Sequence, residues 1–416
     1  MDSKILLFFF LFINLYFPIS PYLVLAVDII LLLSYSKKKL ITPSLRPFVV
    51  IPVILFFLAS LSFLLAGEEG ESFVVFKYIR TFISGIVVIL LSYRIKVEPK
   101  YFLRCLGAVL VLHMIAIIAQ SLYPPLSMMM APYFNFARDE DFLLNMNVRK
   151  LGLAGGYDLA SMLLVSSVVL FYQQFFKTKN FLYFIFAVIA LALTLTVSRF
   201  GMVICAVTVA YYAVISFTKT GFVRLSGIFL SVIGGAVIVL LIIPILASTN
   251  GLLFDVGTIS NVDISYFLQD YSSASGTLYD LTDPNSEHLG AFKQLDLFQF
   301  FFGAGNSSDS DIGYMQFLFQ IGLIGVSLLF FFYFEIIKRI RKIKTNDENL
   351  ITIKTFLIVY IILLFVFNYK IQILYSRGFH ELMIICFVYL IHWNRMLLNK
   401  QINIEQKHNE YTDCMC

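Results

Sequence analysis

The sequence predicts an all-α polytopic membrane protein with about twelve transmembrane helices and two long loops on one side. Hydrophobic residues make up 59% of the 416 residues and charged residues only 14%, and the mean hydropathy is +0.85. A soluble globular chain has about 25% charged residues. The composition therefore excludes a soluble enzyme, a disordered protein and a nucleic-acid-binding protein, and it requires lipid as the main solvent.

The apolar runs give the number of helices, because a spanning helix needs about 20 mostly apolar residues. The candidate spans are 4–19, 21–35, 48–66, 73–93, 102–122, 158–176, 180–197, 201–217, 225–247, 312–334, 352–369 and 379–396. Pro18 and Pro21 favour a break between the first two. A signal peptide is the alternative for the first run, but no small-x-small cleavage site follows it, which favours an uncleaved span.

Lys and Arg residues set the orientation. They gather in every second loop, as in the run from Lys338 to Lys344, and basic loops face the cytoplasm. Both termini are therefore expected in the cytoplasm, and the basic runs are topology signals rather than nucleic-acid sites.

The spans divide the chain into six parts. These are helices 1–5 (1–122), a first long outer loop (123–157), helices 6–9 (158–247), a large acidic outer loop (248–311), helices 10–12 (312–396) and a cytoplasmic tail (397–416). Connections beyond about 12–15 residues are usually functional or disordered, and the aromatic content of both loops argues against disorder. In the large loop, Asp283-Pro284 and Gly303 predict a surface helix over 284–302.

Two cations lie inside the fourth span. Lys77 and Arg80 are three residues apart and share a helix face, roughly 6–11 Å below the outer boundary. A cation at that depth costs several kcal/mol, on the order of the insertion penalty, unless it is paired or hydrated. Snorkelling to the surface is the alternative, but two cations on one face favour an anion-binding site that faces the protein interior.

Two outer turns carry further cations. Arg199 lies in the tight turn Ser198-Arg199-Phe200-Gly201, and arginine suits phosphate because its planar fork forms bidentate hydrogen bonds. Arg377 and His380 precede the last span and would complete a cationic rim, or Arg377 would instead pair with Glu381. Arg138 and Arg149, in the first long loop, are weaker candidates.

His288 is the candidate general base, since histidine titrates near neutral pH; Glu287 is the reserve, and an ordinary surface histidine is the alternative. No histidine pair or Cys-x-x-Cys has metal-ligand spacing, so neither a metal nor a cofactor is expected.

Cations gathered at the outer interface suit a lipid-linked diphosphate, and an acidic, tyrosine-containing loop suits sugar hydroxyls.

These residues resemble a known family. Ser198-Arg199-Phe200-Gly201 is similar to the Ser-Arg-x-Gly signature of bacterial O-antigen polymerases and ligases. The segment from Asp311 to Gly325 resembles the family's entry into the span that follows its large periplasmic loop. The order of parts also matches over the whole chain, although the motifs cover only about 25 residues, roughly one span length.

The resemblance implies a GT-C-like, metal-independent inverting glycosyltransferase of the bacterial inner membrane. Its substrate would be an undecaprenyl-diphosphate-linked oligosaccharide, with membrane lipid and a chain-length regulator protein as further partners. Arg199 maps onto the motif arginine, and Lys77, Arg80 and Arg377 would join it in binding the diphosphate. His288 lies in a region comparable to the ligase histidine, but the ligase pattern is not reproduced, which favours a polymerase over a ligase. A lipid-linked oligosaccharide flippase is the alternative from another class.

Overall fold

The computed structural model describes residues 3–16, 26, 29–30, 45–92, 96–123, 125–126, 129–130, 150–220, 295–308, 312–376 and 378–413. Within these ranges every regular element is helical. The helices are α1 (Ser3–Tyr16), α3 (Pro47–Ala66), η2 (Gly67–Glu69), α4 (Ser72–Ser92), α5 (Pro99–Leu122), α8 (Tyr157–Thr178), α9 (Phe181–Val197), α10 (Arg199–Thr220), α15 (Leu297–Phe302), α16 (Gly313–Lys342), α17 (Glu348–Phe367) and α18 (Phe379–Asp413).

In the described residues, the predicted all-helical architecture is confirmed, and its long apolar helices are consistent with a multi-pass membrane protein. Seven described helices are long and apolar enough to cross a bilayer: α3 with η2, α4, α5, α8, α16, α17 and the first part of α18. Shorter apolar helices lie at Ser3–Tyr16, Phe181–Thr194 and Phe200–Tyr212. The predicted spans 225–247 and, almost entirely, 21–35 lie outside the described residues, so the number twelve stays a prediction.

Local sequence explains where several helices begin. Proline occupies the first position of α3 and α5, where no intrahelical N–H bond is lost. Asn180 and Asp347 cap α9 and α17, each accepting a hydrogen bond from a backbone N–H of the first turn. The spans predicted from apolar runs end close to the observed helix ends, whereas the span 352–369 was predicted to begin four residues after the observed start of α17 at Glu348.

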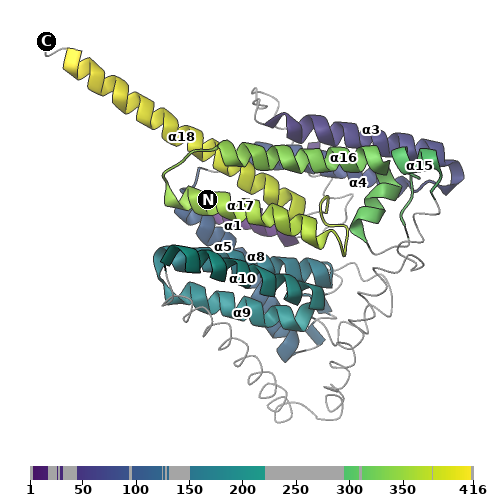
Figure 1. Cartoon of the computed structure of the whole chain (residues 1–416), viewed down its shortest axis with the longest axis horizontal. Coiled ribbons are helices and arrows are strands. Elements are labelled where there is room, and N and C mark those ends of the chain that lie inside the picture. The colour runs from purple at the N-terminus through teal and green to yellow at the C-terminus, as the bar shows by residue number, and fades with distance from the viewer. Residues whose placement is uncertain are drawn as a thin grey trace, which may run out of the picture.

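Figure 1 shows the long helices lying side by side, with α3, α4 and α16 on one side, α8, α9 and α10 on the other, and α1, α5, α17 and α18 between them. Aromatic contacts join α18 to its neighbours: Phe387 lies 4.9 Å from Phe48 of α3, and Tyr389 stacks on Phe102 of α5 at 4.1 Å, both between ring centres. Large apolar side chains also cover the outside, such as Leu64, which is 73% exposed. An apolar exterior of this kind fits lipid rather than water.

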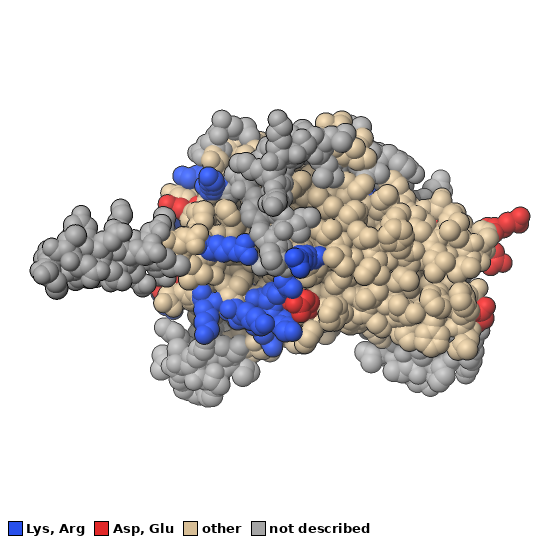
Figure 2. Space-filling model, turned by 90° about the horizontal axis from the view of Figure 1, so that it is seen from above, with Lys and Arg blue, Asp and Glu red and all other residues tan. Residues whose placement is uncertain are grey.

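The two ends of the bundle differ in charge. Figure 2 shows the Lys and Arg side chains gathered toward one end, with a few Asp and Glu among them, whereas the opposite end shows Asp and Glu alone. At the basic end, the Lys177 amino group donates to Asn349 Oδ1 at 2.6 Å. At the other end, in the turn after α3, Glu68, Glu69 and Glu71 are exposed. This polarity matches the alternation of basic loops; which end faces the cytoplasm stays a prediction. We call the end that carries the α3–α4 turn the outer end.

The predicted surface helix needs a correction. Leu295 and Asp296 are not helical, so no continuous helix runs over 284–302; the described part is α15, which begins at Leu297. Asp296 caps it, accepting from the Gln299 backbone N–H at 2.7 Å, while the Gln299 side chain accepts from the Asp296 N–H. Gly303 ends the helix at φ +94°, as predicted.

Helix α16 is broken near its outer end. Gly322 has φ +65°, a conformation that favours glycine, and the helix kinks there (Figure 1). The residues after α15 fit against the short piece: the Ala304 and Gly305 N–H groups both donate to the Phe319 carbonyl, at 2.7 and 3.1 Å. The end of the large loop is thereby held between α3 and α16.

Candidate functional site

Lys77 lies in the second turn of α4 at the outer end, and its side chain is only 8% exposed. Its amino group donates a hydrogen bond to Gln372 Oε1 and lies 5.3 Å from the centre of the Phe317 ring. Arg80, one turn further along α4, is half-buried. The buried position of Lys77 is the one expected for a cation that faces the protein interior rather than one that snorkels.

Two glutamine side chains extend this polar cluster. Gln372 Nε2 donates to Gln320 Oε1 at 2.9 Å, and the Tyr78 hydroxyl lies 3.5 Å from the same oxygen. Gln320 is 2% exposed and belongs to the short piece of α16. A buried amide must satisfy both its donor and its acceptor groups, so the chain of hydrogen bonds fixes the orientation of the Gln372 oxygen toward Lys77. We call Lys77, Tyr78, Gln320 and Gln372 the outer polar cluster.

The turn that carries Gln372, residues 368–378 between α17 and α18, is itself held by side chains. Asn368 Oδ1 accepts from the N–H groups of Ile373 and Leu374, at 2.9 and 3.1 Å. The Ser376 hydroxyl donates to the Gln372 carbonyl at 2.6 Å. Each bond closes a short loop, so contacts within the turn hold Gln372 in position independently of its hydrogen bond with Lys77.

At the start of α18, the structure differs from the predicted cationic rim, because His380 is buried. His380 is 1% exposed, and its Nδ1 lies 3.3 Å from the Tyr333 hydroxyl, so it forms part of the packed interior. Glu381 accepts from the Ser84 hydroxyl at 2.9 Å through Oε1 and from the Gly378 N–H at 2.6 Å through Oε2. Glu381 therefore joins α18 to α4. Arg377, its other predicted partner, lies outside the described residues.

The Ser-Arg-x-Gly turn is tightly packed between α8, α9 and α10. The Ser198 hydroxyl donates to Asp158 Oδ1 at 2.6 Å, and the Gly201 N–H donates to the Ser198 oxygen at 3.3 Å. A Cβ at Gly201 would lie 2.4 Å from the Ser161 Cβ, so only glycine fits without a shift. The serine and the glycine of this motif therefore stabilise the turn, which places Arg199 at the first position of α10. The Arg199 side chain lies outside the described residues.

The outer end of α17 connects this turn to the outer polar cluster. Phe200, the residue after Arg199, packs edge-on against Phe367 at 5.4 Å between ring centres. Phe367 is the last residue of α17 and directly precedes the turn that carries Gln372. The Ser-Arg-x-Gly turn therefore contacts the last residue of α17 through an aromatic pair, and Lys77 contacts the turn that follows α17 through the Gln372 amide.

The end of the first long loop forms a second group of buried polar contacts, which sequence reasoning missed. Gln120 exchanges two hydrogen bonds with the Gly152 backbone, at 2.8 and 2.9 Å, and the Leu153 N–H donates to His113 Nδ1 at 3.1 Å. Lys150, just before, is 6% exposed, and burial lowers its pKa to about 8. The signal was weak, since a lone glutamine or histidine in an apolar run predicts no particular partner.

The remaining predicted site residues lie outside the described residues: His288 and Glu287, the candidate bases, and Arg138 and Arg149. Among the residues that are described, no group of His, Cys, Asp or Glu side chains could hold a metal ion. Metal-independent chemistry therefore stays a prediction.

No protein-family model matches the chain, and no curated protein is similar enough to it to count as a relative. The family resemblance therefore rests on the motif residues and the order of the helices alone.

Proposed function

We propose that the protein is an O-antigen polymerase that joins undecaprenyl-diphosphate-linked oligosaccharide repeat units at the periplasmic face of the bacterial inner membrane. The observation that carries the proposal is the connection of Lys77 and of the Ser-Arg-x-Gly turn to one outer structure, the end of α17 with its following turn. Cations held at one membrane interface are what a lipid-linked diphosphate requires.

The reaction would be a transfer with inversion. An acceptor sugar hydroxyl on one carrier attacks the anomeric carbon of the glycan on another, and the bond to the diphosphate breaks. Arg199, Lys77, Arg80 and Arg377 would stabilise the charge that develops on the departing undecaprenyl diphosphate, which needs no metal if cations supply that charge. His288, or Glu287 in reserve, would accept the hydroxyl proton.

Transfer to lipid A-core, the ligase reaction, uses the same donor and the same leaving group, so the outer polar cluster supports both. A transporter is favoured by a different observation, the break at Gly322, because discontinuous helices often form transport sites. That break, however, is packed by backbone: the Phe301 carbonyl oxygen lies 2.3 Å from where a Gly322 Cβ would be. Such close packing supports a fixed joint rather than a site that opens.

The test is transfer by purified full-length protein with a lipid-linked repeat unit, with and without lipid A-core. We expect polymer from the repeat unit alone. Arg199→Ala should abolish polymer formation without reducing membrane abundance, whereas Lys96→Ala, at the exposed basic end, should leave it intact. Product only with lipid A-core would show a ligase. Movement of the lipid-linked oligosaccharide across vesicles without any new glycosidic bond would show a transporter.

A further inference from the structure

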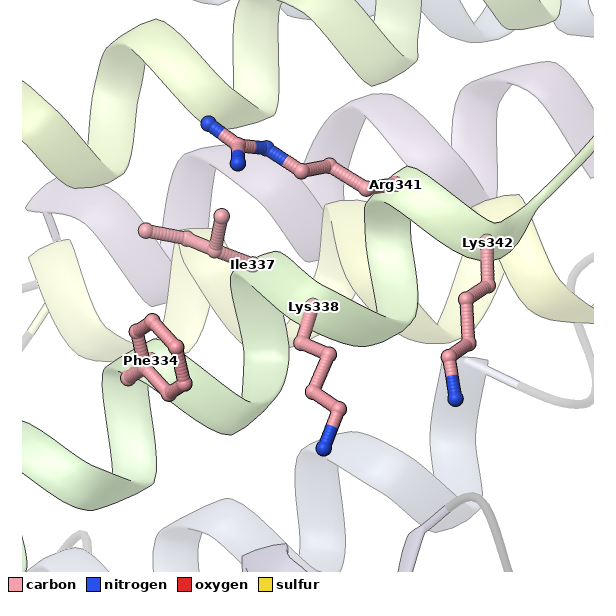
Figure 3. A pocket seen from close by; sticks show the side chains of 5 residues that line it. All are labelled: Phe334, Ile337, Lys338, Arg341 and Lys342. Carbon is pink, nitrogen blue, oxygen red and sulfur yellow. The ribbon is translucent and has the colours of Figure 1, made fainter.

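A basic hollow lies at the end of α16 that is remote from the outer polar cluster. Its volume is about 310 Å³, it is open, and it is lined by Phe334, Ile337, Lys338, Arg341 and Lys342 (Figure 3). The spacing of these residues places them along one side of the helix. We call this feature the α16 hollow.

The cations of the hollow are incompletely neutralised. Glu335 is the nearby carboxylate, and its Oε1 already accepts from Arg339 at 2.9 Å, while Oε2 lies 3.7 Å from Lys338. Within the described part of the chain, the Arg341 and Lys342 side chains have neither an ion pair nor a hydrogen bond, and both are exposed. Figure 3 shows the Lys338 and Lys342 amino groups extending to the same side, and Arg341 to the opposite side. The hollow therefore attracts anions.

The carbonyl end of the helix does not cancel this attraction. A helix C-terminus carries partial negative charge that would repel an anion. Here Lys354 of α17 donates to the Ile343 carbonyl at 2.7 Å and lies 3.3 Å from the Arg341 carbonyl oxygen. An additional cation thus covers the last carbonyls, and the positive charges of the hollow remain effective.

The apolar neighbours of the hollow indicate a lipid rather than a soluble anion. Phe334, one turn before Lys338, is 63% exposed, and Phe331 is 56% exposed. From the break at Gly322 to Lys342 the helix rises about 30 Å, the thickness of a bilayer hydrocarbon core. The cations are therefore at headgroup depth, and the exposed aromatic rings are at the depth of acyl chains.

We propose that the α16 hollow binds the headgroup of an anionic phospholipid of the surrounding bilayer. Lys338 and Lys342 contact its phosphate, Arg341 supplies a second cationic position across the hollow, and Phe334 packs against an acyl chain. Clusters of Lys and Arg next to a spanning helix attract anionic lipid in this way. The proposal is independent of the reaction at the outer end.

The test is native mass spectrometry of the full-length protein in neutral detergent, titrated with phosphatidylglycerol or phosphatidylcholine. We expect selective retention of phosphatidylglycerol. The double variant Lys338→Gln/Lys342→Gln should lower its affinity about thirtyfold, given the usual contribution of two cations near a surface. Lys96→Gln/Lys100→Gln, also two exposed lysines, is the control and should bind as the natural protein does. All four side chains are exposed, and unchanged thermal midpoints would verify folding.

Three outcomes would overturn the proposal. The first is equal affinity in the two double variants. The second is displacement of phosphatidylglycerol by inorganic phosphate at the same concentration, since the hollow would then bind any phosphate rather than a lipid. The third is variant-sensitive binding of an acidic peptide without binding of phosphatidylglycerol, which would assign the hollow to a protein partner.

Discussion

Lys77 and Gln372 lie 295 residues apart in the chain, and their side chains form a hydrogen bond beneath the outer turn between α17 and α18. Lys77→Met keeps the length of the side chain and removes its charge. We expect polymer formation to fall about ten- to hundredfold, the usual worth of a charge-assisted hydrogen bond. The measurement is transfer per unit of folded protein, and Lys96→Met is the charge-matched control. Full activity of Lys77→Met would remove Lys77 from the diphosphate site.

The hydrogen bond between Ser198 and Asp158 should stabilise the turn that carries Arg199. Because the acceptor is a carboxylate at a partly exposed position, we expect a coupling free energy of about 1–2 kcal/mol in a double-mutant cycle of Ser198→Ala and Asp158→Ala. Chemical unfolding in detergent is the measurement. Ser166, whose hydroxyl donates to Met162 within α8, gives the control: Ser166→Ala and Asp158→Ala should be additive. Equal coupling in both cycles would contradict a specific contact.

The sequence predicted the helices well because their signals are local. A run of apolar residues in lipid must form a helix to satisfy its own backbone, so the apolar runs alone predicted these helices, whereas the start signals at Pro47, Pro99 and Asp347 were not used. The break at Gly322 was missed, since its left-handed conformation arises from contact with Phe301, a residue of another element. The start of α15 at Leu297 does have a local signal, the capping box of Asp296 and Gln299, which the prediction from Asp283-Pro284 overlooked.

For the contacts of the candidate site, the sequence predicted the charged residue but not its neutral partners. Lys77 was visible because a cation inside an apolar span is costly and demands an explanation. Gln372 and Gln320 were not, since a neutral amide in or near a span carries no such cost, and its partner cannot be read from a distant part of the sequence. Glu381 was considered only as a possible partner of Arg377, and its bonds to Ser84 and to the Gly378 N–H could not be read from helical spacing.

Gly322→Ala should destabilise the protein strongly. The residue has φ +65°, and an added Cβ would lie 2.3 Å from the Phe301 carbonyl oxygen, so α15 and α16 would have to separate. We expect a loss of more than about 3 kcal/mol, or failure to accumulate in the membrane. Gly85→Ala, inside α4, is the matched control, because the added Cβ would lie 3.4 Å from Ile384 Cδ1, an ordinary contact distance. This substitution should be neutral, or it should stabilise the protein by up to about 1 kcal/mol. Equal effects of the two substitutions would show that the break at Gly322 is not fixed by this contact.

Lys150 should make stability depend on pH in the alkaline range. Burial at the end of the first long loop lowers its pKa to about 8, against about 10.4 for a lysine in an unfolded chain. Between these values the unfolded state binds more protons than the folded state, so the free energy of unfolding rises with pH from about 8 to about 10.4. Below pH 8 both states are protonated, and the penalty of burying the charge is present in full.

Thermal unfolding in detergent between pH 7.5 and 10.5 measures this dependence. Lys150→Met, which removes the titrating group, should raise the midpoint at pH 7.5 and flatten the rise with pH. Lys96→Met, at an exposed lysine on the basic end, should leave the slope of the natural protein unchanged. If Lys150→Met and the natural protein share one slope across this range, the rise originates elsewhere, and the Lys150 amino group keeps an ordinary pKa because water reaches it.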